Sequence, residues 1–152
     1  ASGIEGVTKA KMMASSMLVV TTNVEGGPRP ESSMEEVNEE TAKAQREQIA
    51  RIRDEIWSLE AAKNLRWLFI TDDDADLDDE HWRRRLLWQL FCRFEVSRDF
   101  HFDTERKRVA WDATAPIPSN DGPLPVRRWP AVTLHDPEVE ERVEKWMQRE
   151  GL

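Results

Sequence analysis

An acidic run is the most conspicuous candidate for chemistry in this sequence, since seven of the nine residues 72–80 are Asp or Glu. Three of these acids alternate like the first ligands of a calcium-binding loop: Asp72, Asp74 and Asp76. Such a loop also needs a glycine at its sixth position and a glutamate at its twelfth. Leu77 and Arg83 occupy those two positions, so the run is not a calcium loop.

Two interpretations of the acidic run remain. Carboxylates at the C-terminal end of a strand often bind ligands in α/β proteins, which favours a looser magnesium site formed by the three alternating aspartates. Alternatively, the acids end a strand and begin the next helix. In that case Asp78 or a neighbour is the N-cap, and Asp79 and Glu80 lie near the positive end of the helix dipole.

The other residues capable of catalysis or metal binding are isolated from one another. The three histidines, His81, His101 and His135, form no HExxH motif, and the single cysteine, Cys92, has no CxxC companion. No nucleophile elbow supports serine catalysis. We therefore expect His101 to be a structural histidine in a strand and Cys92 to be a small core residue.

Composition limits the function classes. A chain of 152 residues suits one domain, and its seven Trp need apolar surroundings, which argues against a fully disordered chain. The net charge of −8 argues against nucleic acid as a partner. The apolar stretch Met12–Val20 is too short to span a membrane, and a lone cysteine is typical of a reducing compartment. We expect a cytoplasmic protein that does not enter a membrane.

The first half of the chain has the pattern of a β-α-β unit. Met17–Thr22 is typical of a short buried strand, and residues 23–32 form an irregular loop rich in Gly and Pro. A long amphipathic helix is expected over residues 33–63, followed by a second buried strand at Arg66–Thr71. If the helix is a crossover, the two strands are parallel.

The second half of the chain predicts two further helices and a hairpin. A Trp-rich helix begins at Trp82, residues 100–111 alternate like a hairpin, and residues 115–130 form an irregular loop with five prolines. Asp136 caps a last helix. One face of that helix carries an apolar stripe: Val139, Val143, Trp146 and Met147. We expect one α/β domain over residues 1–152, a small mixed sheet with a parallel β-α-β unit, flanking helices and a C-terminal helix.

Several short motifs follow one another in the order and spacing of a known domain. A strand ending in DDDAD is followed by a helix with a Trp, and then by RFEVSRD, RVAWDAT, RRWP and DPEV. This series resembles the C-terminal domain of the UbiD-like decarboxylases, which use prenylated FMN to add or remove carboxyl groups on aromatic and unsaturated acids. The resemblance is clear from about Arg66 onward and looser before it. It implies structural or assembly roles for Asp74, Asp76, Trp88, Arg93, Arg98, Asp99, Asp112, Thr114 and Trp129.

The resemblance implies no catalytic residue in this chain. Family members are considerably longer, and their flavin-phosphate, metal and catalytic residues lie in preceding domains. Prenylated FMN and a divalent metal are therefore expected on a partner chain, although Lys9 or Lys11 is a candidate for approaching a cofactor phosphate. A short hairpin here replaces a substantial family loop near the substrate, and Val96 stands where the family usually has Pro.

Two functions are consistent with these features. The first is a small subunit, or a C-terminal fragment, of a UbiD-like carboxy-lyase that assembles with a larger catalytic chain as a hetero-oligomer. The second is a freestanding acidic adaptor that binds another protein through its long helix and its Trp-rich helix and has no enzymatic role. The motifs do not specify the substrate, the direction of carboxyl transfer or the stoichiometry. The identity of whatever co-purifies with the chain separates the two functions.

Overall fold

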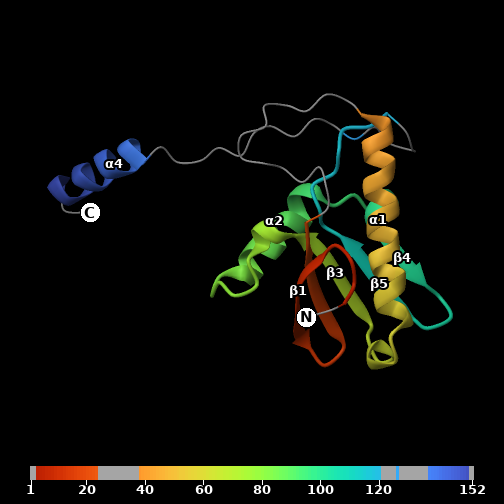
Figure 1. Cartoon of the computed structure of the whole chain (residues 1–152). Coiled ribbons are helices and arrows are strands. Elements are labelled where there is room, and N and C mark those ends of the chain that lie inside the picture. Colours follow the sequence, from red (N-terminus) through yellow and green to blue (C-terminus); the bar gives the residue numbers. More distant parts are fainter. Residues whose placement is uncertain (1–2, 24–37, 121–125, 127–136, 151–152) are drawn as a thin grey trace.

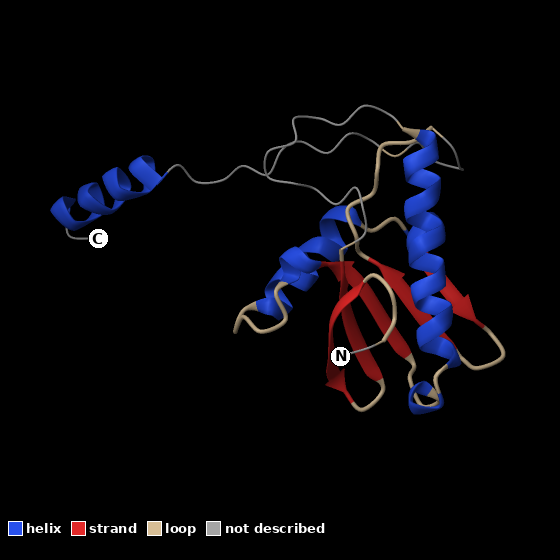
Figure 2. Cartoon of the chain, viewed as in Figure 1, coloured by secondary structure: helices blue, strands red, loops and turns tan. Residues whose placement is uncertain are grey.

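Five strands form one mixed sheet in the order β1-β2-β3-β5-β4 (Figures 1 and 2). The structure is a computed structural model that describes residues 3–23, 38–120, 126 and 137–150. The strands are β1 (Val7–Ala14), β2 (Met17–Thr22), β3 (Trp67–Asp72), β4 (Phe100–Asp103) and β5 (Arg108–Asp112). The neighbouring strands β2, β3 and β5 are parallel, whereas β1 and β4 pair antiparallel at the two edges. The predicted α/β class with a parallel β-α-β unit is therefore confirmed.

Helices lie on both faces of this sheet. They are α1 (Glu39–Ser58), α2 (Trp82–Arg93), the short α3 (Val96–Asp99) and the C-terminal α4 (Pro137–Glu150), with 3-10 turns η1 (Glu60–Ala62) and η2 (Asp73–Ala75). Alternate residues of a strand point to opposite faces, and buried clusters lie on both sides of β3. The result is a central sheet between α1 and α2, while α4 lies apart from it (Figure 1). None of the helices described is long and apolar enough to cross a membrane.

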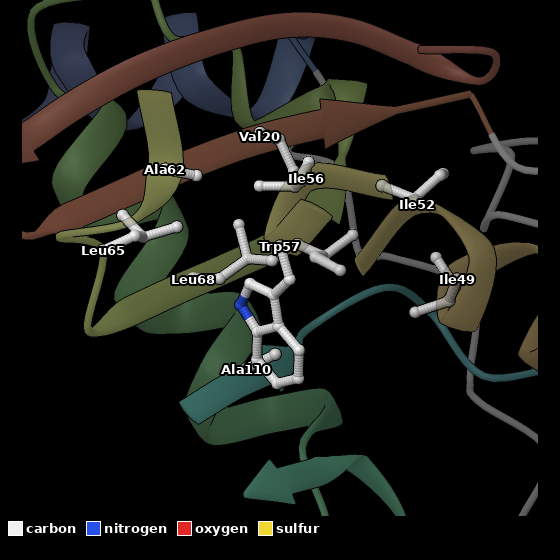
Figure 3. Close-up of a cluster of buried hydrophobic side chains, with 10 residues drawn as sticks. Val20, Ile49, Ile52, Ile56, Trp57, Ala62, Leu65, Leu68 and Ala110 are labelled. Carbon is white, nitrogen blue, oxygen red and sulfur yellow. The ribbon is translucent and has the colours of Figure 1, made fainter. Parts of the chain in front are cut away.

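The main core lies between α1 and the sheet (Figure 3). Ile49, Ile52 and Ile56 recur along one face of α1 and pack against Leu68 and Ile70 of β3. Leu68 is 0 % exposed and Ile52 is 1 % exposed, so this contact supplies much of the apolar burial that holds the crossover helix in place. On the other face of the sheet, α2 contributes its own cluster: Val19, Phe69, Leu77, Trp82 and Leu86.

The helix predicted over residues 33–63 is shorter in the structure. It begins after Asn38, whose side chain accepts a hydrogen bond from the Thr41 amide at 3.0 Å. It ends at Ser58 because Leu59 adopts an extended conformation with φ −67° and ψ 133°. The prediction was therefore wrong at the C-terminal end, where η1 replaces the last turn. Residues 33–37 lie outside the described residues.

Two elements were not predicted from the sequence. Strand β1 was missed, although it forms one edge of the sheet and pairs with β2. The four-residue α3 was also missed, because its motif carries no apolar period. The hairpin is confirmed, since β4 pairs with β5 and Phe100 lies opposite Trp111.

Parts of both predicted irregular loops lie outside the described residues. Residues 24–32 are among these, as are 121–125 and 127–136, which include Trp129 and the helix cap predicted at Asp136. Between the described parts of the second loop, Ser119 and Val126 form an isolated antiparallel bridge.

Candidate functional site: an ion-paired acidic centre

The carboxyl ends of the three parallel strands meet at one edge of the sheet, and aspartates stand at two of these ends. Asp72 closes β3 and is the register partner of Thr22, the last residue of β2. Asp112 closes β5 and lies opposite Ile70 of β3. This edge is where open α/β sheets usually bind ligands, so its polar groups are the first candidates for a functional site.

Arg93, at the end of α2, forms the centre of the network at this edge. Its guanidinium donates from Nη1 to Asp72 Oδ2 at 2.7 Å and from Nη2 to Asp74 Oδ2 at 3.2 Å. Asp72 Oδ2 also accepts the backbone N–H of Ala115 at 2.8 Å. Arg93 is 4 % exposed and Asp72 is 5 % exposed, so this ion pair is buried. It joins the end of β3, the end of α2 and the segment after β5.

Gln89, one turn earlier on α2, connects two parts of the same network. Its amide nitrogen donates to Asp74, and its amide oxygen accepts from the hydroxyl of Thr71. The face of Trp88 lies 5.4 Å from the Arg93 guanidinium, which adds a cation–π contact. Gln89 is 0 % exposed, and both the nitrogen and the oxygen of its amide are hydrogen-bonded, as expected for a buried amide.

A second group of charged residues borders the first. Asp99 pairs with Arg98, and Arg98 Nη2 also donates to the backbone oxygen of Arg93 at 2.9 Å. Asp112 Oδ1 accepts the backbone N–H of Thr114 at 2.9 Å and the Thr114 hydroxyl at 2.6 Å. The fold therefore brings together most of the residues to which the sequence resemblance gave a structural role.

Burial raises the pKa values of three carboxyl groups in this centre. For Asp72 burial outweighs the opposing Arg93 charge and raises the pKa to about 7. For Asp112 burial outweighs the hydrogen bonds from Thr114 and raises the pKa to about 6. The pKa of Asp99 is also raised by burial, against the hydrogen bond from Arg98. The centre therefore holds protons more readily than carboxyl groups in water do.

The other acids of the run face β1. Lys9 Nζ donates to Asp76 Oδ1 and to Asp78 Oδ2, each at 2.7 Å. The hydrogen bond from Lys9 lowers the pKa of Asp76 below its usual range. Lys11 Nζ donates to the backbone oxygen of Leu77 at 2.6 Å. Both lysines that the resemblance offered to a cofactor phosphate thus bind the acidic run of their own chain.

The prediction that Asp78 or a neighbouring acid caps α2 was wrong. The N-cap of α2 is His81, and its side chain makes no capping hydrogen bond. Asp79 instead accepts the backbone N–H of His81 at 2.5 Å and so stabilises the turn before the helix. The first turn of α2 contains arginines and no acid. The acidic run therefore turns the chain between β3 and α2 without capping the helix.

An open groove of about 540 Å³ lies between the 74–79 segment and the first turns of α2. Its lining combines acids, two tryptophans and two arginines: Asp74, Ala75, Asp76, Asp79, His81, Trp82, Arg84, Arg85 and Trp88. On one side of this groove Asp74 and Asp76 are paired with Arg93 and Lys9, whereas Arg84 and Arg85 on the α2 side form no ion pair with a described residue.

The centre is better suited to holding elements together than to proton transfer. An aspartate with a pKa near neutrality is typical of acid–base catalysis. A general acid or base must also reach its substrate, whereas Asp72 is buried and shares one oxygen between Arg93 and Ala115. Within the described part of the chain, no three His, Cys, Asp or Glu side chains are grouped to hold a metal ion.

Sequence reasoning missed two glutamines that organise this region. Gln89 is described above, and Gln45 of α1 donates to the Ala115 oxygen at 2.8 Å while accepting from the Ile117 amide at 3.2 Å. Gln45 thereby fixes the segment that presents the Ala115 amide to Asp72. A polar residue on the apolar face of α1 was the available signal, since buried amides are rare unless they are hydrogen-bonded.

Comparison with known proteins identifies solved structures that share this fold. No protein-family model matches this chain, and no curated protein sequence matches it. Solved structures of decarboxylases do match it over nearly its whole length. The chain has the fold of part of a UbiD-like decarboxylase, which confirms the resemblance seen in the sequence at the level of fold.

The matching structures include vanillic acid decarboxylase from Sedimentibacter hydroxybenzoicus. Its closed form gives a TM-score of 0.57 at 15 % identity, covering 93 % of this chain and 29 % of that chain. Its open form gives 0.54 at 16 % identity, covering 95 % and 30 %. An evolved dimeric form of the UbiD-class enzyme HmfF from Pelotomaculum thermopropionicum, in complex with prFMN, gives only 0.48 at 13 % identity. This chain thus spans about 30 % of the length of the decarboxylase chain that it resembles.

Proposed function

We propose that this chain is a small subunit, or the C-terminal part, of a UbiD-like carboxy-lyase and serves its assembly. The observation that carries the proposal is the coverage of the structural match, 95 % of this chain but 30 % of the decarboxylase chain. A complete enzyme of that kind needs the remaining part from a larger chain. The expected partner is therefore a UbiD-like catalytic chain, and the expected assembly is a hetero-oligomer in the cytoplasm.

The described residues do not fit a cofactor site of their own. Lys9 and Lys11 are engaged with Asp76, Asp78 and the Leu77 carbonyl, and the described carboxylates are not grouped as metal ligands. We therefore assign prenylated FMN and its divalent metal to the larger chain. The role of this chain is to present a rigid surface, which the buried pairing of Arg93 with Asp72 stabilises.

Co-expression of this chain with a UbiD-like catalytic chain tests the proposal. We expect the two chains to co-purify, and light scattering with mass spectrometry to give a hetero-oligomer. A flavin-like absorption spectrum is expected in the complex and is expected to disappear when the larger chain is removed. If the catalytic chain binds flavin and reaches full activity without this chain, the proposal is wrong.

The alternative is an acidic adaptor without a link to carboxyl chemistry. The exposed apolar side chains of α2 and α4 favour it, because surfaces of this kind mark protein contacts. Proteins captured on this chain from cells would then be unrelated to flavin enzymes. The identity of the captured chain, read by mass spectrometry, separates the two functions.

A further inference from the structure

The groove between the 74–79 segment and the start of α2 has a lining that the proposed assembly role does not use. It is open to solvent and has a volume of about 540 Å³, which suits a small ligand. One wall is the segment between β3 and α2, and the other is formed by Arg84, Arg85 and Trp88 of α2. Helix α1 lies on the opposite face of the sheet and does not line this groove (Figure 1).

The first wall offers hydrogen-bond acceptors whose charge is largely compensated within the chain. Asp74 is paired with Arg93 at 3.2 Å, and Asp76 is paired with Lys9 at 2.7 Å. Asp79 forms no ion pair with a described residue. Asp76 and Asp79 are exposed and line the groove, and carboxylate oxygens accept hydrogen bonds from hydroxyl groups. This wall therefore favours a ligand that carries several hydroxyl groups.

The second wall offers cations that lack a charge partner among the described residues. Arg84 and Arg85 are exposed, and neither forms an ion pair with a described carboxylate. The Arg85 guanidinium lies over the Trp88 ring, 5.6 Å from its centre, and this contact restricts its movement. A guanidinium held over a ring can still donate through its edge, and that edge binds two oxygens of a phosphate group. The second wall is therefore suited to a phosphate.

The two tryptophans of the lining argue against an aromatic ligand. Arg85 and Arg93 lie 5.6 and 5.4 Å from the centre of the Trp88 ring, so both cations compete with an aromatic ligand for the faces of this ring. Trp82 is only 3 % exposed, which leaves little of its ring for stacking. The exposed part of Trp88, 41 % of the residue, can contact the C–H groups of a sugar instead.

We propose that this groove binds a sugar phosphate, with the phosphate on Arg84 and Arg85 and the sugar hydroxyl groups on Asp76 and Asp79. The two ends of such a molecule match the two walls, whereas inorganic phosphate or a free sugar satisfies only one of them. Among the charged residues of the lining, the two arginines and a single carboxylate, Asp79, lack an ion pair with a described residue, and this excess of positive charge favours an anion. The site needs only this chain, so its failure would leave the proposed assembly role untouched.

Isothermal titration calorimetry of the 152-residue chain tests this inference, with ribose 5-phosphate and glucose 6-phosphate as probes. The titrations are made at an ionic strength of about 0.15 M, so that weak attraction between exposed charges is screened. We expect a dissociation constant below about 1 mM for at least one of the two probes. Inorganic phosphate, ribose and benzoate are each expected to bind at least about tenfold more weakly. Benzoate represents the aromatic acids, because it has an anion and a ring but no hydroxyl group.

Variants of the two walls separate their contributions. Arg84→Ala and Arg85→Ala are each expected to weaken binding of the sugar phosphate about tenfold, because each removes a charge-assisted hydrogen bond. Asp79→Asn is expected to reduce the preference for the sugar phosphate over inorganic phosphate about threefold, because a neutral amide is a poorer acceptor for hydroxyl groups. Arg51→Ala is the matched control, since Arg51 is exposed on α1 and does not line the groove. Circular dichroism checks that every variant is folded.

Four outcomes would overturn the inference. If neither probe binds the wild-type chain at about 10 mM, the groove is not a sugar-phosphate site. Inorganic phosphate that binds as tightly as the probes would make the groove a simple anion patch, and benzoate that binds more tightly would make it a site for aromatic acids. Folded Arg84→Ala and Arg85→Ala variants that bind the probes like the wild-type chain would place the site elsewhere.

Discussion

At the scale of single residues, Asp74 links the surface of the acidic run to the buried network. It accepts from Gln89 and from Arg93, and its side chain is 37 % exposed, whereas the neighbouring Asp73 is exposed and takes no part in these contacts. Buried hydrogen-bonding groups that lose a partner destabilise the folded state by about 1–3 kcal/mol. Asp74 therefore stabilises the fold mainly by accepting hydrogen bonds from Gln89 and Arg93.

Asp74→Ala is expected to lower the free energy of unfolding by about 1–3 kcal/mol, and Asp73→Ala by less than about 0.5 kcal/mol. Urea unfolding followed by circular dichroism measures both. We also expect Asp74→Ala to impair folding or assembly before it impairs any activity of a complex. A variant that assembles normally with the catalytic chain and is nevertheless inactive would contradict a structural role.

Asp72 makes stability depend on pH near neutrality. Its pKa is about 7 in the folded chain and near 3.8 when unfolded, so the folded chain binds more protons between these values. The stabilising effect is therefore complete below the unfolded pKa and is lost as pH rises through about 7. Asp112, with a folded pKa of about 6, acts in the same direction. The lowered pKa of His101 acts in the opposite direction, but only below its usual 6.5.

We expect the free energy of unfolding to fall by about 1 kcal/mol between about pH 6.5 and about pH 8, almost entirely through Asp72, because Asp112 is already largely ionised at the start of this range. Urea titrations at several pH values measure the slope. Asp72→Asn is expected to remove most of it, whereas Asp73→Asn should leave it unchanged. A wild-type stability that stays constant or rises across this range would show that Arg93 holds Asp72 ionised throughout.

At the scale of elements, an apolar pattern was sufficient to predict the strands and the helix whose residues face the core. Strands β2 and β3 and helix α1 were predicted because VVTT, LFITD and the Ile49, Ile52, Ile56 series are buried. Strand β1 was missed because it is an edge strand, whose pattern VTKAKMMA alternates exposed and half-buried residues. Lysines on such strands prevent edge-to-edge pairing, and here they also bind the acidic run.

The acidic centre was predictable only in part for a similar reason. Its acids follow a recognisable strand, and the resemblance gave Arg93 and Arg98 structural roles without naming their partners. Gln89 and the Ala115 amide contribute through contacts between residues that are far apart in the sequence, and no local pattern marks such contacts.

The N-terminal cap of α1 is the local interaction that this element most clearly requires. Asn38 accepts from the Thr41 amide at 3.0 Å, and its own backbone N–H donates to the Pro118 oxygen at 3.2 Å. Asn38→Ala is expected to lower the free energy of unfolding by about 1 kcal/mol, whereas Asn38→Asp retains an acceptor and should cost much less. Thermal unfolding compares the two variants. Equal losses in both would show that the side chain does not act as a cap.

At the scale of the whole molecule, the chain divides into a packed body and an unsupported helix. The sheet with α1 and α2 has apolar cores on both faces, so it has the burial that an independent domain needs. Helix α4 adds no buried side chain to that body among its described residues. We therefore expect α4 to contribute little to the stability of the described body.

Deleting residues 137–152 separates the two contributions. The truncated chain is expected to unfold within about 0.5 kcal/mol of the full chain when both are dilute, because the body loses no packing. Urea unfolding curves of the two chains measure this difference. A truncated chain that is much less stable than the full chain would show that α4 packs on its own body.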